Sequence, residues 1–243
     1  FTVWNFCFWL CRKMKIDKEM SLMLSSAVSI CGVSAAVATA GAIKGDKKKL
    51  SYVVSLVLVV AVPMILIMPG LAKLMGLPED MAGAWIGGTI DTTGAVAATG
   101  AIYGEVALQT STIVKFSQNV LLGVAAFLIS IYWSYSKKEV AEEKPTLKVI
   151  WLRFPKFVLG FVAASVVFSF FVAPEIVSEA KPILKNIQGM WFALAFMSIG
   201  LETDFKSLIT SENRRSTYAF LGAQAFNVVF TLLVAWILFG LIA

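Results

Sequence analysis

The sequence contains no histidine, the commonest metal ligand and the side chain that titrates nearest neutral pH. A histidine metal site and a histidine proton relay are therefore excluded within these 243 residues. The phosphate-binding pattern GxxxxGK[ST] is also missing, which argues against a nucleotide-driven pump. We expect no cofactor, no metal site and no enzymatic activity, since the Ser/Lys dyad that an intramembrane enzyme would need has no visible signature in the sequence.

Charged residues are scarce: they make up 15% of the chain, whereas 58% of it is hydrophobic. In soluble proteins about a quarter of the residues are charged. The composition indicates an all-α, polytopic helical membrane protein surrounded by lipid. The net charge of +6 comes from basic residues in short loops between apolar runs. Because positive loops are typical of membrane topology, we expect no nucleic-acid partner.

Cysteine is also rare, and Cys7, Cys11 and Cys31 all lie in apolar runs. Cys7 and Cys11 are one helical turn apart, but two thiols without further ligands do not make a metal site. We interpret the pair as small buried hydrophobic residues. The chain opens on FTVWNFCFWL, without an initiator Met, a charged n-region or a cleavage site. We therefore interpret its start as the tail of a span rather than a signal peptide, and expect further residues upstream.

Apolar runs of about 20 residues, the length that a span needs, recur along the chain. They predict a single transmembrane domain over 1–243, with a polar loop at 134–154. Pro63 and Pro69 predict that one span kinks or ends early. Loop charges place 134–156 and 206–215 on the same, cytoplasmic side. The predicted spans, the first of them partial, are at about residues 1–11, 20–43, 51–72, 83–103, 110–133, 155–174, 187–203 and 216–243.

The stretch 83–105, GAWIGGTIDTTGAVAATGAIYGE, combines an apolar span with the carboxylate of Asp91 near its middle. A charge at that depth costs on the order of 3 kcal/mol. The small and hydroxylated residues around Asp91 weaken a helix, and such backbone is tolerated in a membrane only where protein or a water-filled cavity covers it. The stretch predicts an interrupted helix that lines a solute site. The alternative is a tightly packed small-residue helix in which a partner satisfies Asp91.

A second stretch, SICGVSAAVATAGAI at 29–43, has the same small-residue character. It matches the first at an offset of 60 residues, with four identical pairs: Ile30 and Ile90, Ala35 and Ala95, Ala38 and Ala98, Thr39 and Thr99. Repeats that bring paired interrupted helices around a midplane site are a recurrent plan of inverted-repeat secondary transporters. Two independent packing helices are the alternative.

A polar cluster opens the span at 110–133, in the segment TSTIVKFSQNVLLG. Lys115 and Asn119 are four residues apart and share a helix face. The Lys115 side chain either extends to the near membrane interface or pairs with Asp91 on the preceding span.

Together these stretches predict a secondary transporter of a small, anionic solute. Asp91 is the predicted ion-coupling group, linked to a proton or a sodium ion, or else a counter-ion to Lys115. A channel and a non-transporting membrane subunit or sensor are alternatives, and the oligomeric state stays open, a homo-oligomer included. The predicted substrate-binding residues are Ser29, Cys31, Gly32, Ser34, Thr92, Thr93, Lys115, Ser117, Gln118 and Asn119.

SICGVSA, TIDTTGAVAATG and TIVKFSQNVLLG, in this order and spacing, resemble a bacterial family of proposed sulfate exporters (YeiH-like, UPF0324). PKFVLGF at 155–161 and MSIGLETDF at 197–205 fit the same pattern, so the resemblance covers nearly the whole chain. It implies about ten spans, of which the first are absent here, and a fold related to inverted-repeat transporters. It also implies a multi-pass protein of the bacterial inner membrane.

The chain departs from that family at two places. The family usually has His-Glu where this chain has Asp91-Thr92, and Arg where it has Gln118. A doubly charged oxyanion is expected to need more than the single cation of Lys115. The resemblance implies export of sulfate, and the two departures extend the expected solutes to a related oxyanion or a carboxylate.

Overall fold

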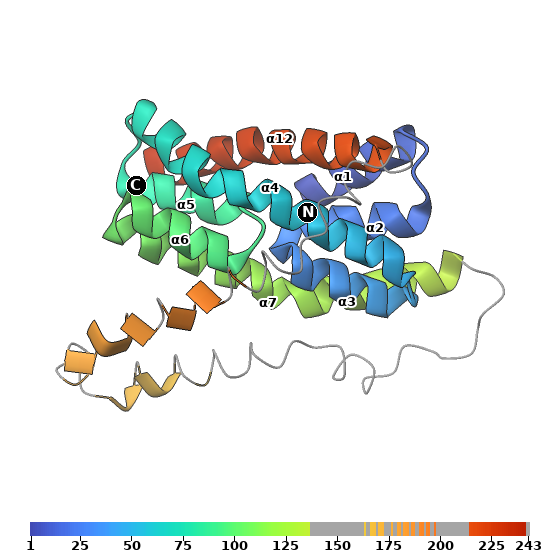
Figure 1. Ribbon diagram of the computed structural model, residues 1–243. Coiled ribbons are helices and arrows are strands. Elements are labelled where there is room, and N and C mark those ends of the chain that lie inside the picture. Colours follow the sequence, from blue (N-terminus) through green and yellow to red (C-terminus); the bar gives the residue numbers. More distant parts are fainter. Residues whose placement is uncertain are drawn as a thin grey trace. The chain divides into compact units, whose positions relative to one another are not determined.

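The computed structural model describes residues 1–136 and 214–241, with scattered positions between 163 and 197. Phe1–Arg153 with Thr203–Ala243 form one compact unit and Phe154–Glu202 another. All the helices labelled in Figure 1 belong to the first unit. The predicted loops at 134–156 and 206–215 lie almost entirely outside the described residues, and the predicted spans 155–174 and 187–203 are described only at scattered positions.

The described part of this unit is built from helices and contains no strand, so the predicted all-α membrane fold is confirmed. Two π-helical segments, η1 (Ala27–Cys31) and η3 (Ile237–Leu241), accompany eight α-helices. The α-helices are α1 (Thr2–Lys13), α2 (Lys18–Ser26), α3 (Val33–Ile43), α4 (Lys47–Leu74), α5 (Glu79–Thr89), α6 (Thr93–Tyr103), α7 (Glu105–Ser136) and α12 (Arg214–Trp236).

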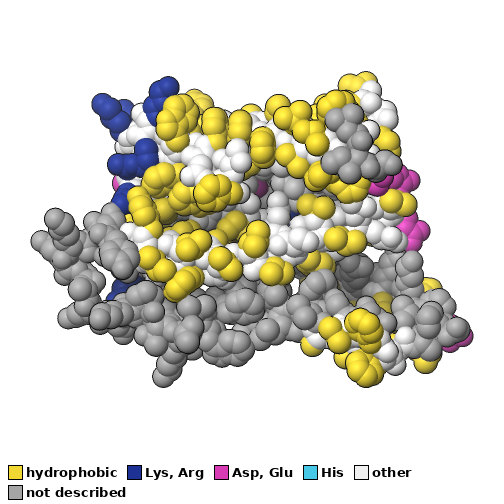
Figure 2. Space-filling model, turned by 180° about the vertical axis from the view of Figure 1, so that it is seen from behind, with side chains coloured by type: hydrophobic (Ala, Val, Ile, Leu, Met, Phe, Trp, Pro, Cys, Tyr) yellow, Lys and Arg dark blue, Asp and Glu magenta, His cyan; other side chains and the backbone are white. Residues whose placement is uncertain are grey.

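Three of the described helices are long and apolar enough to cross a membrane: Lys47–Leu74, Glu105–Trp133 and Arg214–Gly240. The surface agrees with such a placement. In Figure 2, hydrophobic side chains cover the middle of the visible face, with Lys and Arg gathered at one end and Asp and Glu at the other. Charged ends around an apolar band are what a bilayer selects, because its hydrocarbon core disfavours exposed charge.

The charged turns are built from helix caps. Asp17 accepts a hydrogen bond from the Met20 backbone at the start of α2, and Asp46 accepts two, from Lys48 and Lys49, at the start of α4. The ammonium group of Lys49 also lies 2.8 Å from the Asp17 carboxylate, so it ties the two helix starts together. Hydrogen bonds from the backbone of Lys49 and Lys48 lower the pKa of the exposed Asp46 below its usual value of 3.8.

Helix α4 runs unbroken through Pro63 and Pro69. Of the two predicted outcomes, an early end of the span is wrong, because the helix continues to Leu74, and a kink stays a prediction. Proline removes one backbone donor and crowds the preceding turn, but the apolar surroundings strongly favour every remaining intrahelical hydrogen bond. Pro69 itself is buried against neighbouring helices.

Two helices are interrupted. The run α2–η1–α3 breaks at Gly32, and α5–α6 breaks at residues 90–92. The second halves, α3 and α6, have 11 residues each. Shifting Val33–Ile43 by the 60-residue offset found in the sequence gives Thr93–Tyr103, so the offset coincides with the helix bounds.

Both interruptions lie between two long helices that are distant in sequence (Figure 1). Helix α7 packs on α3, η1, α5 and α6, and α12 packs on α1, η1 and α5. The approach of α5 to α7 is close. A Cβ added to Gly83 would lie 2.7 Å from the Ala107 carbonyl oxygen, and one added to Gly87 2.5 Å from that of Ser111. Small residues are typical of helix interfaces in membranes because they allow such backbone contact.

Candidate functional site

The two interruptions meet. A Cβ added to Gly32 would lie 3.2 Å from the Asp91 Cβ and 3.3 Å from the Thr92 Cγ2, so the breaks are in van der Waals contact. Helices α3 and α6 both begin here, and in this part of the structure no side chain caps either N-terminus. Uncapped N-termini carry partial positive charge and free N–H groups, which favour an anion.

Lys115, from α7, occupies one side of this meeting point and is only 1% exposed. Its Nζ donates to the Ile30 carbonyl oxygen at 3.1 Å and to the Gln118 Oε1 at 2.6 Å. The carbonyl is one that the break after η1 leaves without an intrahelical donor. The side chain therefore does not extend to the interface, and no ion pair joins Lys115 to Asp91, two residues that are both described.

Helix α12 contributes two amides on the other side. The Gln224 Nε2 donates to the Thr89 carbonyl oxygen at 2.9 Å, and the Asn227 Nδ2 donates to the same oxygen at 3.1 Å. Asn227 also lies 3.4 Å from the Val28 carbonyl oxygen. These N–H groups satisfy the backbone carbonyl oxygens of Thr89, at the end of α5, and of Val28, in η1. Neither residue was predicted from the sequence, although two amides in the middle of the apolar run 216–243 indicate a polar site there.

Three buried oxygen atoms at this place have no hydrogen-bond partner among the described residues: Asp91 Oδ2, Asn119 Oδ1 and Gln224 Oε1. Asp91 is 2% exposed. Asn119 donates its Nδ2 to the Thr93 Oγ1 at 3.2 Å, so its oxygen is the atom left over. A buried polar atom without a partner costs about 1–3 kcal/mol, and native proteins accept that cost mainly at functional places.

The remaining predicted residues divide into two groups. Gly32, Thr92 and Thr93 contact the meeting point directly, and Cys31 is buried beside it. Ser29 donates to the Ser25 carbonyl oxygen at 2.7 Å, and the exposed Ser117 donates to the Ile113 carbonyl oxygen at 2.9 Å. Ser34 is exposed in the first turn of α3, two residues after Gly32. The roles of these three serines as solute ligands stay predictions.

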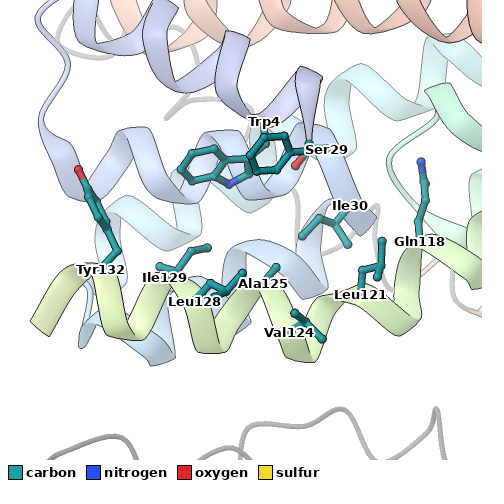
Figure 3. A pocket seen from close by; sticks show the side chains of 11 residues that line it. Trp4, Ser29, Ile30, Gln118, Leu121, Val124, Ala125, Leu128, Ile129 and Tyr132 are labelled. Atoms are coloured by element: carbon teal, nitrogen blue, oxygen red, sulfur yellow. The ribbon is translucent and has the colours of Figure 1, made fainter.

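An apolar groove of about 450 Å³ leads toward this place between α1, η1 and α7. Figure 3 shows its wall along α7, from Tyr132 at one end to Gln118 at the other, with Trp4 and Ser29 above. Gln118 is the residue that holds the Lys115 ammonium group. The groove therefore ends one hydrogen bond away from the buried cation.

The arrangement combines one buried cation, one buried carboxylate and two helix N-termini in a region enclosed by apolar residues. In such surroundings a charge interacts strongly with its neighbours because little water screens it. The geometry suits the binding of small ions.

Comparison with known proteins shows a family. The family described as "Conserved hypothetical protein 698" matches residues 1–219. The UPF0324 membrane protein RB9488 of Rhodopirellula baltica is 40% identical, over 97% of this chain and 45% of its own length. A UPF0324 membrane protein of Nitratidesulfovibrio vulgaris is 40% identical over 93% of this chain and 41% of its own length. The UPF0324 membrane protein NE0724 of Nitrosomonas europaea is 33% identical over 81% of this chain and 46% of its own length.

The chain thus spans about half the length of the curated relatives that it matches. No solved structure matches it. The resemblance found in the sequence is confirmed at the level of the family: the chain belongs to the UPF0324 family of membrane proteins.

Proposed function

We propose that this chain forms the core of a secondary transporter for a small anionic solute, in which Asp91 is the ion-coupling carboxylate. The protein would cross a bacterial inner membrane several times and catalyse no chemical reaction. The observation that carries the proposal is the contact between the two interrupted helices at Gly32 and Asp91. Paired half-helices that meet near the bilayer midplane are the arrangement by which secondary transporters hold solutes.

The anionic character of the solute follows from the charges. Lys115 supplies a buried ammonium group, of which two donors are used by Ile30 and Gln118. An ammonium group has three donors, so one has no partner among the described residues and could bind a ligand. The uncapped N-termini of α3 and α6 add backbone N–H groups of the same polarity. Sulfate, sulfite and small carboxylates all have oxygens that match these donors.

The coupling role of Asp91 follows from its burial. The Asp91 carboxylate is 2% exposed, has one oxygen unpartnered in the described structure and forms no ion pair with Lys115. Such a carboxylate costs free energy while it is charged and has no cation bound. A proton or a metal cation removes that cost. Binding of the coupling ion therefore changes the charge beside the anion site, which links the two ions energetically.

Transport by the purified protein in proteoliposomes tests this function. Labelled sulfate, sulfite and small carboxylates are offered under imposed proton and sodium gradients. We expect Asp91→Asn to abolish gradient-driven uptake while the protein inserts and folds normally. Glu105→Gln, at the exposed start of α7, is the matched control and should leave uptake unchanged. Unchanged uptake by Asp91→Asn would make the carboxylate structural and refute the coupling role.

Lys115 is tested by ligand-dependent stabilisation. A bound anion raises the unfolding free energy by RT ln(1 + [L]/Kd). We expect Lys115→Gln to lose this gain, and also to lose stability because the Ile30 carbonyl loses its donor. The double variant Lys115→Gln with Asp91→Asn should recover part of the fold stability without recovering anion binding. Full anion binding by Lys115→Gln would refute the anion site.

A further inference from the structure

Three acceptor oxygens remain without partners in the described structure at the meeting of the interrupted helices, and they come from three different elements. Asp91 lies in the break between α5 and α6, Asn119 on α7 and Gln224 on α12. Their residues are 2%, 3% and 4% exposed. While Asp91 is ionised, all three atoms are acceptors, so none of them can satisfy another. A proton on Asp91, another donor or a cation is then the missing partner.

The two amides are held on either side of Asp91. The Gln224 Nε2 donates to the carbonyl of Thr89, two residues before Asp91. The Asn119 Nδ2 donates to the hydroxyl of Thr93, two residues after Asp91. Because each amide nitrogen is fixed to the chain beside Asp91, each amide oxygen is left near the same break.

We infer that a sodium ion binds at this break, with Asp91 Oδ2, Asn119 Oδ1 and Gln224 Oε1 as its protein ligands. The inference rests on the proposed function, whose coupling ion it names. Carboxylate and amide-carbonyl oxygens are hard ligands, which suit alkali and alkaline-earth cations rather than transition metals.

The charge of the site selects a monovalent ion. Asp91 is its single carboxylate, and the described residues contain no group of three His, Cys, Asp or Glu side chains. Lys115 adds a buried positive charge at the same meeting of the interrupted helices. A calcium or magnesium ion would need more negative charge than one carboxylate supplies beside an ammonium group. With sodium bound, Asp91 is neutralised and Lys115 is left to balance one negative charge on the solute.

Thermal unfolding of the purified wild-type protein in detergent provides the test. NaCl is titrated at constant ionic strength against choline chloride, with KCl in a parallel series. We expect a saturable rise in Tm with sodium and none with potassium beyond the choline baseline. Equal effects of sodium, potassium and choline would reflect ionic strength alone and would overturn the inference.

Variants then identify the ligands. Asp91→Asn should lose the sodium response, and Asn119→Ser and Gln224→Met should each raise the half-saturating sodium concentration at least tenfold. Glu105→Gln, at the exposed start of α7, is the control, because it removes a carboxylate whose oxygens are not among the unpartnered atoms. It should leave that concentration unchanged. Unchanged sodium affinity in both Asn119→Ser and Gln224→Met would overturn the ligand assignment. If a variant does not fold, the sodium, potassium and choline series on the wild-type protein decides whether sodium binds.

The result also separates this inference from the proposed function. Anion uptake that follows a proton gradient equally well with sodium replaced by choline would overturn the sodium site and leave the transporter intact. Sodium-specific stabilisation in a protein that moves none of the anions would support the site and refute the transport function.

Discussion

At the scale of single residues, Gly32 carries the break between η1 and α3. Its φ of +63° lies in a region that side chains rarely adopt, and its ψ of −111° excludes the common left-handed helical conformation. The Gly32 N–H bonds to the carbonyl of Ala27, five residues earlier, whereas the Gly32 carbonyl accepts from the N–H of Ala36, four residues later. The hydrogen-bond spacing therefore changes from π-helical to α-helical at Gly32. Any side chain at position 32 would adopt a strained backbone conformation and would also clash with a neighbouring residue.

We therefore expect Gly32→Ala to destabilise the protein by about 1–3 kcal/mol. The new Cβ would lie 2.8 Å from the Val57 Cγ1 in addition to its unfavourable φ. Gly41→Ala is the matched control, since Gly41 lies inside helix α3 and a Cβ there meets nothing within 4 Å. It should stabilise the helix by roughly 0.5–1 kcal/mol. Thermal unfolding measures both, and equal effects would contradict the assigned strain.

Asp46 gives a pH-dependent prediction outside the membrane. Its pKa is lowered by hydrogen bonds from the backbone of Lys49 and Lys48, so its stabilising effect is complete above the unfolded value of 3.8. The effect is lost as the pH falls through the lower, folded pKa. Asp46→Ala should therefore lower the Tm at pH 7, and the difference from wild type should shrink below about pH 4. Asp46→Asn, which keeps an acceptor but no charge, should show a smaller and pH-independent loss.

Asp91 and Lys115 could be located from the sequence, because each is an ionisable residue within an apolar run. One partner of Lys115, Gln118, belongs to the predicted polar cluster. The other is the backbone carbonyl of Ile30, and every residue has such a carbonyl. Such a contact depends on where the break falls in three dimensions, so composition could not reveal it. Gln224 and Asn227 carried a weaker signal because amides cost less than charges at that depth.

At the scale of elements, the sequence predicted that the stretch 83–105 would interrupt a helix, and the break at residues 90–92 confirms this. The offset of 60 residues also anticipated the equal second halves α3 and α6. The π-helical segment η1 before Gly32 left no comparable trace. Its residues, AVSIC, have no unusual helix propensity, and neighbouring side chains from α7 and α12 stabilise its freed carbonyls.

The packing of α5 on α7 makes a prediction at this scale. A Cβ at Gly87 would lie 2.5 Å from the Ser111 carbonyl oxygen and 2.9 Å from its Cα, both backbone atoms that cannot move alone. Gly87→Ala should cost about 1–3 kcal/mol, the usual range for overpacking. At the neighbouring Gly88, the nearest atom would be a Thr231 methyl at 3.4 Å. Gly88→Ala should be nearly neutral, and a similar Tm loss in both variants would contradict the close approach.

At the scale of the whole molecule, the three native cysteines are buried, which makes labelling from outside selective. The loop charges predict that positions 136 and 211 lie on the same side of the membrane. Single cysteines introduced as Ser136→Cys and Ser211→Cys should react with an impermeant maleimide from the same side in oriented vesicles. Wild-type protein, with Cys7, Cys11 and Cys31 only, should stay unlabelled. Reaction from opposite sides would remove one span from the predicted topology.

The glycine contacts between α5 and α7 limit how this molecule can move. Sliding α7 by one residue along α5, about 1.5 Å, would press side chains such as that of Ile86 against the α7 backbone that now faces Gly83 and Gly87. Shear between these two helices is therefore blocked, and the pair must rotate as one rigid body. In the proposed cycle, spin-label distances from α5 to α7 are expected to stay constant, while those from α7 to η1, across the contact of Lys115 with Ile30, alternate.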